Sequence, residues 1–584
     1  MRFESPLAVA TAAADGRGAP LAWPRRGDVA AIVVLIALPA VIFGVPALLG
    51  HAVHPGDDLT QNLPLRVLAG RDIRAGHLPL FDPYAWSGAP LLAGWNAAAA
   101  YPLTWLFAIV PATAAWTVNM VAAWAVAGLG MFCFLRALRL RSLAAFLGAF
   151  SFALAGGMSA QVSHLGLVAG MSWVPLGLLS ILRLGQERPV ASRLRWTAVL
   201  ATVTGLVILA GEPRAIDDAC AILGIYAVWQ VARLGRRAGP AAVSVAAGLA
   251  LGACLGAVQW LPGLTAISGS QRGADSLALY SSGSLPVRWV LLTLVPDLFG
   301  GSGSLGQPSF FDFYNLTEVT SYVGILPLVA AFALLGRIRW RRSPPEWIVW
   351  HVMAAAGVAL ALGGNTPLGN LFFHLPLFGD QRLQSRNILV LDLALAVLFA
   401  YWADRPSGRR PVRRPALETA LGLVPALAAV VVVALALTWG AGFLHWAGMG
   451  VSPGASVLGR LKPWLTPYAA LGAGAAALVL ARRRLGLDLR SRLIAGFVVV
   501  DVLVFTILCV VEVRPGVFAI SGTAGGGPAS SGGSASSGGP ASPAARAAAG
   551  QTGTAPLRPV GALGYPGRFA IYDPGLLDPG QLSG

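Results

Sequence analysis

Long, continuously apolar segments recur along the chain from residue 29 to residue 512. Each is close to the ~20 residues that a helix needs to cross ~30 Å of hydrocarbon. The strands of a membrane barrel would instead alternate apolar and polar residues over ~10 positions, and these segments do not alternate. The pattern therefore predicts an all-α polytopic membrane protein.

Thirteen segments have the length and the apolar character of a membrane span. They lie at residues 29–49, 113–135, 142–160, 166–184, 196–211, 216–234, 240–262, 321–336, 347–363, 387–403, 417–438, 465–481 and 493–512. Two further apolar segments, 101–111 and 287–299, are short and interrupted by proline. We expect these two to lie at the membrane interface or to re-enter the membrane.

Composition agrees with this class: 56% of the residues are hydrophobic and only 11% are charged. Soluble domains carry roughly 25% charged residues, so an ordinary soluble enzyme is excluded. The net charge of +17 is a topology signal. If the N-terminus is cytoplasmic, 28 of the 42 basic residues fall in cytoplasmic segments, as the positive-inside rule requires. We therefore expect a multi-pass cell-membrane protein with an extracytoplasmic C-terminus and no nucleic-acid partner.

The same reading divides the chain into four parts. Residues 1–28 are a cytoplasmic tail, and residues 29–512 form the transmembrane domain, whose first outer loop spans residues 51–98. Residues 513–550 are a Gly/Ser/Ala/Pro-rich linker, which is typical of a flexible coil. Residues 551–584 are the start of an incomplete extracytoplasmic segment.

The first outer loop holds four carboxylates within 26 residues: Asp57, Asp58, Asp72 and Asp82. Adjacent carboxylates repel each other, so Asp57 and Asp58 are a candidate site for proton transfer or for cation binding. The alternative, equally supported by the spacing, is that an aspartate caps a helix over residues 59–75.

Short motifs along most of the chain occur in the order found in one membrane-protein family. They are GDDLTQNLPLR at 56–66, GHLPLFDPYAWSGAP at 76–90, SHLGLVAGMSWVPL at 163–176, GEPR at 211–214, QWLP and SQRG within 259–273, LVPDLFGG at 294–301, EVTSYVGILPL at 318–328 and GNTPLGNLFFHLPLFGDQRLQSRN at 364–387. In these motifs the chain resembles the YfhO family of bacterial membrane proteins, which are themselves similar to the GT-C glycosyltransferases. The resemblance implies a GT-C-like bundle of about 13 transmembrane helices.

The resemblance also implies an activity: transfer of a sugar from a polyprenyl-phosphate donor to a hydroxyl of a cell-envelope glycan or glycolipid, on the outer face of the bilayer. Such a reaction needs a base for the acceptor hydroxyl and cations for the leaving phosphate. The family opening places Asp58 as the preferred base and Asp57 as the second candidate, with Gln61 in the same motif. A divalent cation such as Mg²⁺ is left open, and no ligand pattern favours zinc.

Outer arginines are the candidates for binding the phosphate, because a guanidinium holds phosphate oxygens in a bidentate manner. They are Arg272, Arg382, Arg386 and Arg214. We expect Arg382 and Arg386 to share one helical face, since they are four residues apart. Glu318 and His164, each at the head of a span, complete the candidate substrate-binding residues. For all of these the alternatives are lipid-headgroup contacts, helix capping and ordinary hydrogen bonding.

Two other functions remain open. A transporter or flippase of lipid-linked glycans would use ionisable residues within the spans, for which Asp392 and Asp501 are candidates unless they only pair with neighbouring helices. A scaffold protein without catalysis would tolerate loss of the first-loop carboxylates.

Overall fold

The protein is described here from a computed structural model of the 584-residue chain. The structure describes residues 25–50, 57–85, 88–154, 156–186, 189–268, 276–301, 307–312, 316–338, 345–375, 378–379, 381–404, 415–449, 455–482 and 484–510. The predicted linker at 513–550 and the segment at 551–584 lie outside these residues, as does most of the N-terminal tail.

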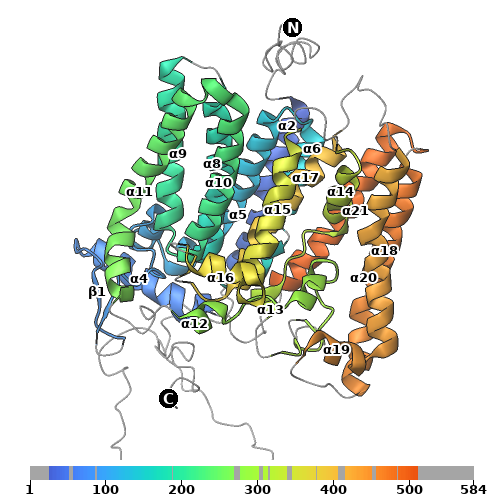
Figure 1. Cartoon of the computed structure of the whole chain (residues 1–584). Coiled ribbons are helices and arrows are strands. Elements are labelled where there is room, and N and C mark those ends of the chain that lie inside the picture. Colours follow the sequence, from blue (N-terminus) through green and yellow to red (C-terminus); the bar gives the residue numbers. More distant parts are fainter. Residues whose placement is uncertain are drawn as a thin grey trace, which may run out of the picture.

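The described part is a bundle of helices that run up and down between two ends (Figure 1). The helices of the bundle are α2 (Arg26–Pro39), continued by η1 (Ala40–Gly44) and α3 (Val45–Leu48), then α5 (Ala112–Ala137), α6 (Ser142–Leu154), α7 (Gly156–Ala160), α8 (Leu165–Leu184), α9 (Val190–Leu209), α10 (Pro213–Leu234), η4 (Gly235–Arg237), α11 (Gly239–Ser268), α14 (Ile325–Leu335), α15 (Trp347–Leu362), α17 (Ile388–Ala403), α18 (Pro415–Trp439), α20 (Ala455–Ala481) and α21 (Leu487–Val510).

The predicted helical membrane architecture is confirmed. Within the described residues, eleven helices are long and apolar enough to cross a membrane. They correspond to eleven of the thirteen predicted spans. The other two predicted spans coincide with α14, an apolar helix of 11 residues, and with α21, a helix of 24 residues.

One end of the bundle, here called the basic end, gathers the arginine-rich connections and ties them together by ion pairs. Salt bridges join Asp28 to Arg136 (2.7 Å), Arg141 to Asp404 (3.2 Å), Arg233 to Glu346 (3.3 Å), Arg337 to Glu418 (2.5 Å) and Arg482 to Glu418 (3.0 Å). These pairs link segments far apart in the sequence. They place the connections that we predicted to be cytoplasmic on the same side of the molecule.

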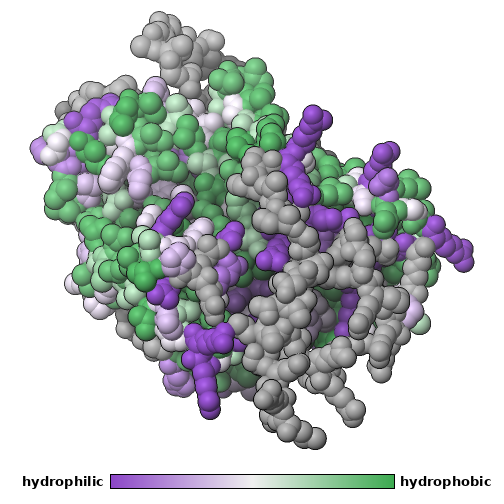
Figure 2. Space-filling model, turned by 90° about the horizontal axis from the view of Figure 1, so that it is seen from above, coloured by the Kyte–Doolittle hydropathy of each residue, from purple (hydrophilic) through white to green (hydrophobic). Residues whose placement is uncertain are grey.

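The basic end is the end at which α2 begins, at the top of Figure 1. Figure 2 views the molecule from this end and shows strongly hydrophilic side chains that project among large areas of hydrophobic surface. Hydrophilic side chains at this end suit helices that reach the surface of a membrane, where charged groups meet water.

The opposite end, here called the site end, carries the long connections between helices (Figure 1). Its elements are η2 (Asp58–Asn62), α4 (Leu63–Arg74), β1 (Phe81–Asp82), β2 (Ala89–Pro90), η3 (Pro102–Ala108), α12 (Leu277–Ser281), η6 (Val287–Thr293), α13 (Leu316–Val319), η8 (Gly363–Asn365), α16 (Pro367–Phe373), η9 (Gln384–Asn387) and α19 (Ala441–Ala447). Strands β1 and β2 form an antiparallel pair in which Phe81 is opposite Pro90. The helix expected over 59–75 is present as η2 and α4.

Close helix packing holds α11 against α9. Gly248, Gly252 and Gly256 recur every four residues along α11, so they share one face of the helix. A Cβ atom added at Gly252 would lie 2.4 Å from the Cβ of Thr204 on α9. Small residues at this spacing let two membrane helices approach closely, which maximises their van der Waals contact.

The two aspartates inside apolar segments cap interrupted helices. Asp392 accepts hydrogen bonds from the backbone N–H of Gly157 (2.5 Å) and from the Ser321 hydroxyl. Asp501 accepts from the Tyr322 hydroxyl (2.7 Å) and from the N–H of Ile325 (3.1 Å). Both carboxylates therefore pair with neighbouring segments, which is the simpler of the two roles considered from the sequence.

Candidate functional site

The two adjacent carboxylates of the first loop face different environments. Asp57 is the residue before η2, and its side chain is 63% exposed. Asp58, the first residue of η2, is fully buried. Successive helical residues point about 100° apart, so a helix that packs on the bundle exposes one of two neighbours and buries the other. The pair is thus divided into an outward and an inward carboxylate.

Asp58 connects the first loop to the head of α8. Its Oδ1 accepts a hydrogen bond from the Asn62 side chain (2.6 Å) and another from the backbone N–H of Leu165 (3.2 Å). Its Oδ2 is buried and has no hydrogen-bond partner among the described residues. Burial disfavours the charged form and raises the pKa of Asp58 to about 6, although the bond from Asn62 opposes this shift.

Near Asp58 lies a second buried charged residue, Arg66, which was not among the predicted site residues. Arg66 is fully buried on α4, and its Nη1 lies 3.4 Å from Thr104 Oγ1 and 3.4 Å from Asn119 Oδ1. Burial lowers the pKa of Arg66 to about 10, and the nearby Asp58 opposes that shift. The signal was available in the sequence, because Asp58, Asn62 and Arg66 recur every four residues and therefore share one helical face.

His164 lies at the centre of the site, at the residue before α8. Its Nε2 is 3.5 Å from an oxygen of Asp57, 3.7 Å from an oxygen of Glu318 and 3.1 Å from Nη2 of Arg386. A hydrogen bond donated by His164 lowers the pKa of Asp57 below its ordinary value, so the exposed carboxylate is ionised at neutral pH. Three residues distant in sequence thus meet around the imidazole ring of His164.

Glu318 and Arg386 form a bidentate ion pair on the other side of His164. Arg386 Nε lies 2.5 Å from Glu318 Oε2, and Arg386 Nη2 lies 2.7 Å from Glu318 Oε1. Burial alone would raise the pKa of Glu318, but the guanidinium lowers it to about 2. The contacts with Glu318 use Nε and Nη2, so the ion pair does not engage the Nη1 amino group of Arg386.

Arg382 and Arg386 do not share a helical face, contrary to our expectation. Leu383 between them adopts a left-handed backbone conformation (φ 61°), and the short helix η9 begins only at Gln384. Arg382 is exposed, whereas Arg386 turns towards His164. The carbonyl of Arg382 accepts a bond from Arg214 (2.6 Å).

The remaining candidates from the sequence are Arg214, Gln61 and Arg272. Arg214 is buried and donates to the side chains of Gln384 (3.3 Å) and Asn387 (3.1 Å), which indicates a structural role. Gln61 is half-buried within η2, one turn after Asp57. Arg272 lies outside the described residues.

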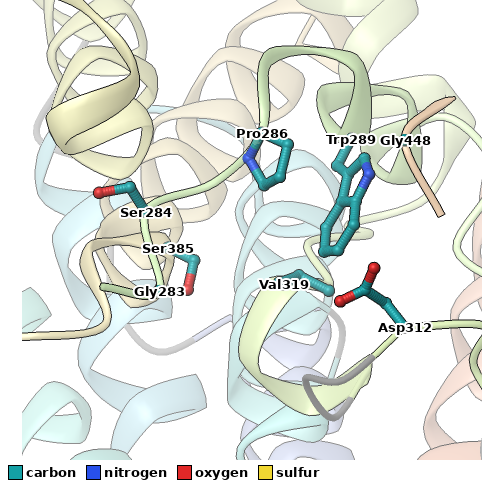
Figure 3. Close-up of a pocket in the computed structure, with 8 residues that line it drawn as sticks. All are labelled: Gly283, Ser284, Pro286, Trp289, Asp312, Val319, Ser385 and Gly448. Carbon is teal, nitrogen blue, oxygen red and sulfur yellow. The ribbon is translucent and has the colours of Figure 1, made fainter. Parts of the chain in front are cut away.

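A cavity of about 180 Å³ adjoins the site. It is lined by Ser284, Trp289, Asp312, Val319 and Ser385, together with three further residues drawn in Figure 3. Val319 follows Glu318 in the sequence and Ser385 precedes Arg386, so two of the segments that line the cavity also carry the Glu318–Arg386 pair. None of its polar lining residues was singled out from the sequence, because they come from separate connections whose proximity depends on the fold.

The arrangement does not suit a divalent cation held by the aspartate pair. Asp57 is turned outward and Asp58 inward, so their oxygens do not converge on one point. Within the described part of the chain, no group of three or more His, Cys, Asp and Glu side chains is placed to hold a metal ion.

No protein-family model matches the chain, and the search of curated proteins finds no match. Among solved structures, the chain is similar to ArnT from Cupriavidus metallidurans bound to undecaprenyl phosphate, with 16% identity and a TM-score of 0.43 over 82% of this chain and 77% of that chain. It is similar also to ArnT from the same organism in the apo state, with 16% identity and a TM-score of 0.39 over 82% of this chain and 76% of that chain. At this identity and these TM-scores, the similarity by itself assigns neither a family nor an activity, and the YfhO resemblance stays a prediction.

Proposed function

We propose that the chain is a membrane glycosyltransferase of the GT-C type. It transfers a sugar from a polyprenyl-phosphate donor to a hydroxyl of a cell-envelope acceptor on the extracytoplasmic face. One observation carries the proposal: an exposed carboxylate, Asp57, and a guanidinium, Arg386, contact the same imidazole nitrogen of His164, at 3.5 and 3.1 Å. A proton acceptor and a cation for phosphate thus lie side by side at the end of a membrane bundle.

These two groups are what the chemistry requires. The acceptor hydroxyl oxygen attacks the anomeric carbon of the donor sugar, and the bond from that carbon to the phosphate oxygen breaks. The hydroxyl proton passes to the carboxylate, and the negative charge collects on the departing polyprenyl phosphate. A cation preorganised beside the phosphate stabilises that charge as it develops.

The exposure of the two carboxylates favours Asp57 as the base. A general base must come within hydrogen-bond reach of the proton that it removes, and only Asp57 faces outward. Asp58 acts as a positioning residue in this proposal, because its bond to the N–H of Leu165 holds the first loop against the head of α8. The sequence motif favoured Asp58 as the base and Asp57 as the second candidate. The exposure of the side chains favours the opposite order, with Asp58 as the second candidate.

Arg386 and Arg382 are the proposed phosphate ligands. Glu318 fixes the orientation of the Arg386 guanidinium and leaves Nη1 for a phosphate oxygen. Arg382 is exposed, lies four residues before Arg386 in the sequence and supplies a second positive charge. A transport function is less supported, because Asp392 and Asp501 are already engaged as helix caps.

Glycan analysis tests the function and the base together. Envelope polymers are compared by mass spectrometry between a strain lacking the gene and the same strain carrying the wild type, Asp57→Asn or Asp58→Asn. We expect a substituent to be missing without the gene, and Asp57→Asn to lower its transfer by about 10²–10⁴-fold, the usual contribution of a general base. Membrane-inserted protein levels are measured for every variant.

Each outcome of that comparison is informative. An unchanged glycan profile without the gene would contradict the proposed activity. Wild-type transfer by Asp57→Asn, with transfer lost in Asp58→Asn at equal protein levels, would return the role of the base to Asp58.

Binding of polyprenyl monophosphate to the purified protein tests the phosphate ligands. Arg382→Ala removes an exposed side chain, so it tests the charge without disturbing the packing. We expect it to weaken binding by about 3–10-fold, because an exposed charge is screened by water. Arg386→Ala should weaken binding by about tenfold or more, because a charge-assisted bond to phosphate contributes ~1.5–3 kcal/mol. Unchanged binding in both variants would remove the arginines from the site.

A further inference from the structure

The cavity near the Glu318–Arg386 pair combines an aromatic wall with polar side chains. One wall is the indole of Trp289, and the carboxylate of Asp312 lies next to it, with Val319 between these residues and Ser385 (Figure 3). An apolar aromatic surface with a carboxylate and hydroxyls around it is the combination that a sugar ring requires. The C–H groups of the ring pack on the aromatic surface, and its hydroxyls need polar partners at the edges.

Trp289 is held in a fixed orientation. Its Nε1 donates a hydrogen bond to the carbonyl of Ala447 (3.0 Å), and the ring of Phe310 meets it edge-on at a centroid distance of 5.4 Å. The indole is only 3% exposed, so its surroundings define which part of the ring faces the cavity. A wall fixed in this way costs little conformational entropy when a ligand binds.

Ser385 provides the independent observation that points to a ligand. Its side chain is 1% exposed, and its hydroxyl has no hydrogen-bond partner among the residues that the structure describes. Its backbone is nevertheless fixed, because its N–H donates to the carbonyl of Gly283 (3.0 Å). A buried hydroxyl without a partner costs roughly 1–3 kcal/mol, and a ligand hydroxyl in the cavity would satisfy it.

The volume of the cavity suits a single sugar ring. Pockets for drug-sized ligands are usually ~300–1,000 Å³, so a cavity of about 180 Å³ is too small for an oligosaccharide. From these observations we propose that the cavity is a subsite for a single monosaccharide ring, held by Trp289, Asp312 and Ser385. This inference rests on the proposed function, in which it names the place of one sugar next to the phosphate-binding arginine.

Two sugars have the required chemistry: the glycosyl group on the donor lipid and a terminal sugar of the acceptor. Both would place hydroxyls near Ser385 and Asp312. The experiment therefore measures monosaccharide binding first and then distinguishes the two sources by competition.

Saturation-transfer difference NMR on the full chain in lipid nanodiscs tests the subsite, with D-glucose, D-galactose, D-mannose, N-acetyl-D-glucosamine and L-arabinose as probes. We expect at least one of them to give a saturable signal. Ser385→Leu fills the cavity and should weaken that binding by about tenfold or more, since the ligand then loses its space. Asp312→Asn keeps the shape and should weaken it by a smaller factor. Thr466→Leu, at an exposed position of α20, is the matched control and should bind as the wild type does.

Competition identifies the source of the sugar. A polyprenyl-phosphate-linked form of the bound monosaccharide displaces the free sugar if the cavity holds the donor's ring, and leaves it bound if the cavity holds the acceptor's ring. Either result supports the subsite. Bare polyprenyl monophosphate should displace nothing.

The subsite and the proposed function fail separately. If none of the five sugars binds, or if Ser385→Leu and Asp312→Asn both bind as the wild type does, the subsite is refuted, whatever the chain does with polyprenyl phosphate. If a sugar binds in the cavity but polyprenyl monophosphate does not bind the protein, the subsite stands and the proposed donor is wrong. Variants are compared only when their thermal unfolding matches that of the wild type, and Asp312→Asn preserves the test if Ser385→Leu fails to fold.

Discussion

At the scale of single residues, the main feature of this protein is the different treatment of two adjacent aspartates. Asp58 is buried and accepts bonds from Asn62 and Leu165, whereas Asp57 is mostly exposed and contacts His164. Burial raises the pKa of the first, and the hydrogen bond from His164 lowers the pKa of the second. Neighbours of identical chemistry thus differ in pKa because of where their side chains point.

This difference predicts how stability depends on pH. The pKa of Asp58 is raised from 3.8 to about 6, so the stabilisation from its bound proton is complete below pH 3.8 and is lost as the pH rises through 6. Above that range the charged carboxylate destabilises the fold by up to about 3 kcal/mol, at 1.36 kcal/mol per pKa unit. We therefore expect Asp58→Asn to raise the unfolding temperature relative to the wild type at pH 8, and by less at pH 5.

The matched control is Glu318→Gln, for which the sign is opposite. The pKa of Glu318 is lowered to about 2, so its pairing with Arg386 stabilises the fold above pH 4.5 and is lost only as the pH falls through 2. Its loss should therefore destabilise the protein equally at pH 5 and pH 8. Both variants are measured by thermal unfolding in detergent, and an Asp58→Asn effect of the same size at both pH values would contradict the assignment.

At the scale of elements, glycine spacing decides how closely two helices approach. Gly252 of α11 faces Thr204 of α9, and a Cβ atom there would also lie 2.7 Å from the carbonyl of Ala201. Gly224 of α10 has no atom within 4 Å of the same position. The two glycines occupy similar helices, so substitution by alanine separates the effect of packing from that of helix propensity.

We expect Gly252→Ala and Gly224→Ala to change stability in opposite directions. Alanine is favoured over glycine in a helix by up to ~1 kcal/mol, which should stabilise the Gly224→Ala variant slightly. At Gly252 the added methyl group meets backbone and side-chain atoms of α9, and overpacking of this kind costs ~1–3 kcal/mol. Thermal unfolding of the two variants in the same detergent measures the difference. Equal shifts would show that α9 and α11 do not pack through these glycines.

At the scale of the whole molecule, the arginine-rich connections and the candidate site lie at opposite ends of the bundle. Ion pairs gather the arginine-rich connections at the basic end, and the cluster around His164 lies among the long connections at the site end (Figure 1). If the positive-inside rule holds for this chain, the site end is extracytoplasmic. The proposed donor and acceptor are then on the same side as the carboxylate.

Cysteine labelling checks this orientation. Leu78, at the site end, is 76% exposed, and Arg236, at the basic end, is also exposed. In a variant with the four native cysteines replaced by serine, we expect Leu78→Cys to react with a membrane-impermeant maleimide in intact spheroplasts. Arg236→Cys should react only after permeabilisation. The reverse pattern would place the site in the cytoplasm and exclude an extracytoplasmic transfer.

The sequence by itself determined the class of the protein, the positions of its helices and the gathering of its arginine-rich connections on one side. These are local properties, because an apolar stretch of sufficient length must form a helix in lipid whatever its neighbours do. It also indicated Asp57, Asp58, His164, Glu318 and Arg386 individually, since charged residues at span boundaries are few.

Only the tertiary structure decided which of these residues meet. Asp57, His164, Glu318 and Arg386 come from four separate connections, and their convergence depends on how the helices pack. The left-handed Leu383 set Arg382 apart from Arg386, and burial in the packed bundle made Asp58 an inward carboxylate beside Arg66. The spacing of residues along the chain shows which face of their own helix they occupy. The distances between site residues, the burial of their side chains and their pKa values depend on how separate helices pack, and the sequence does not show that packing.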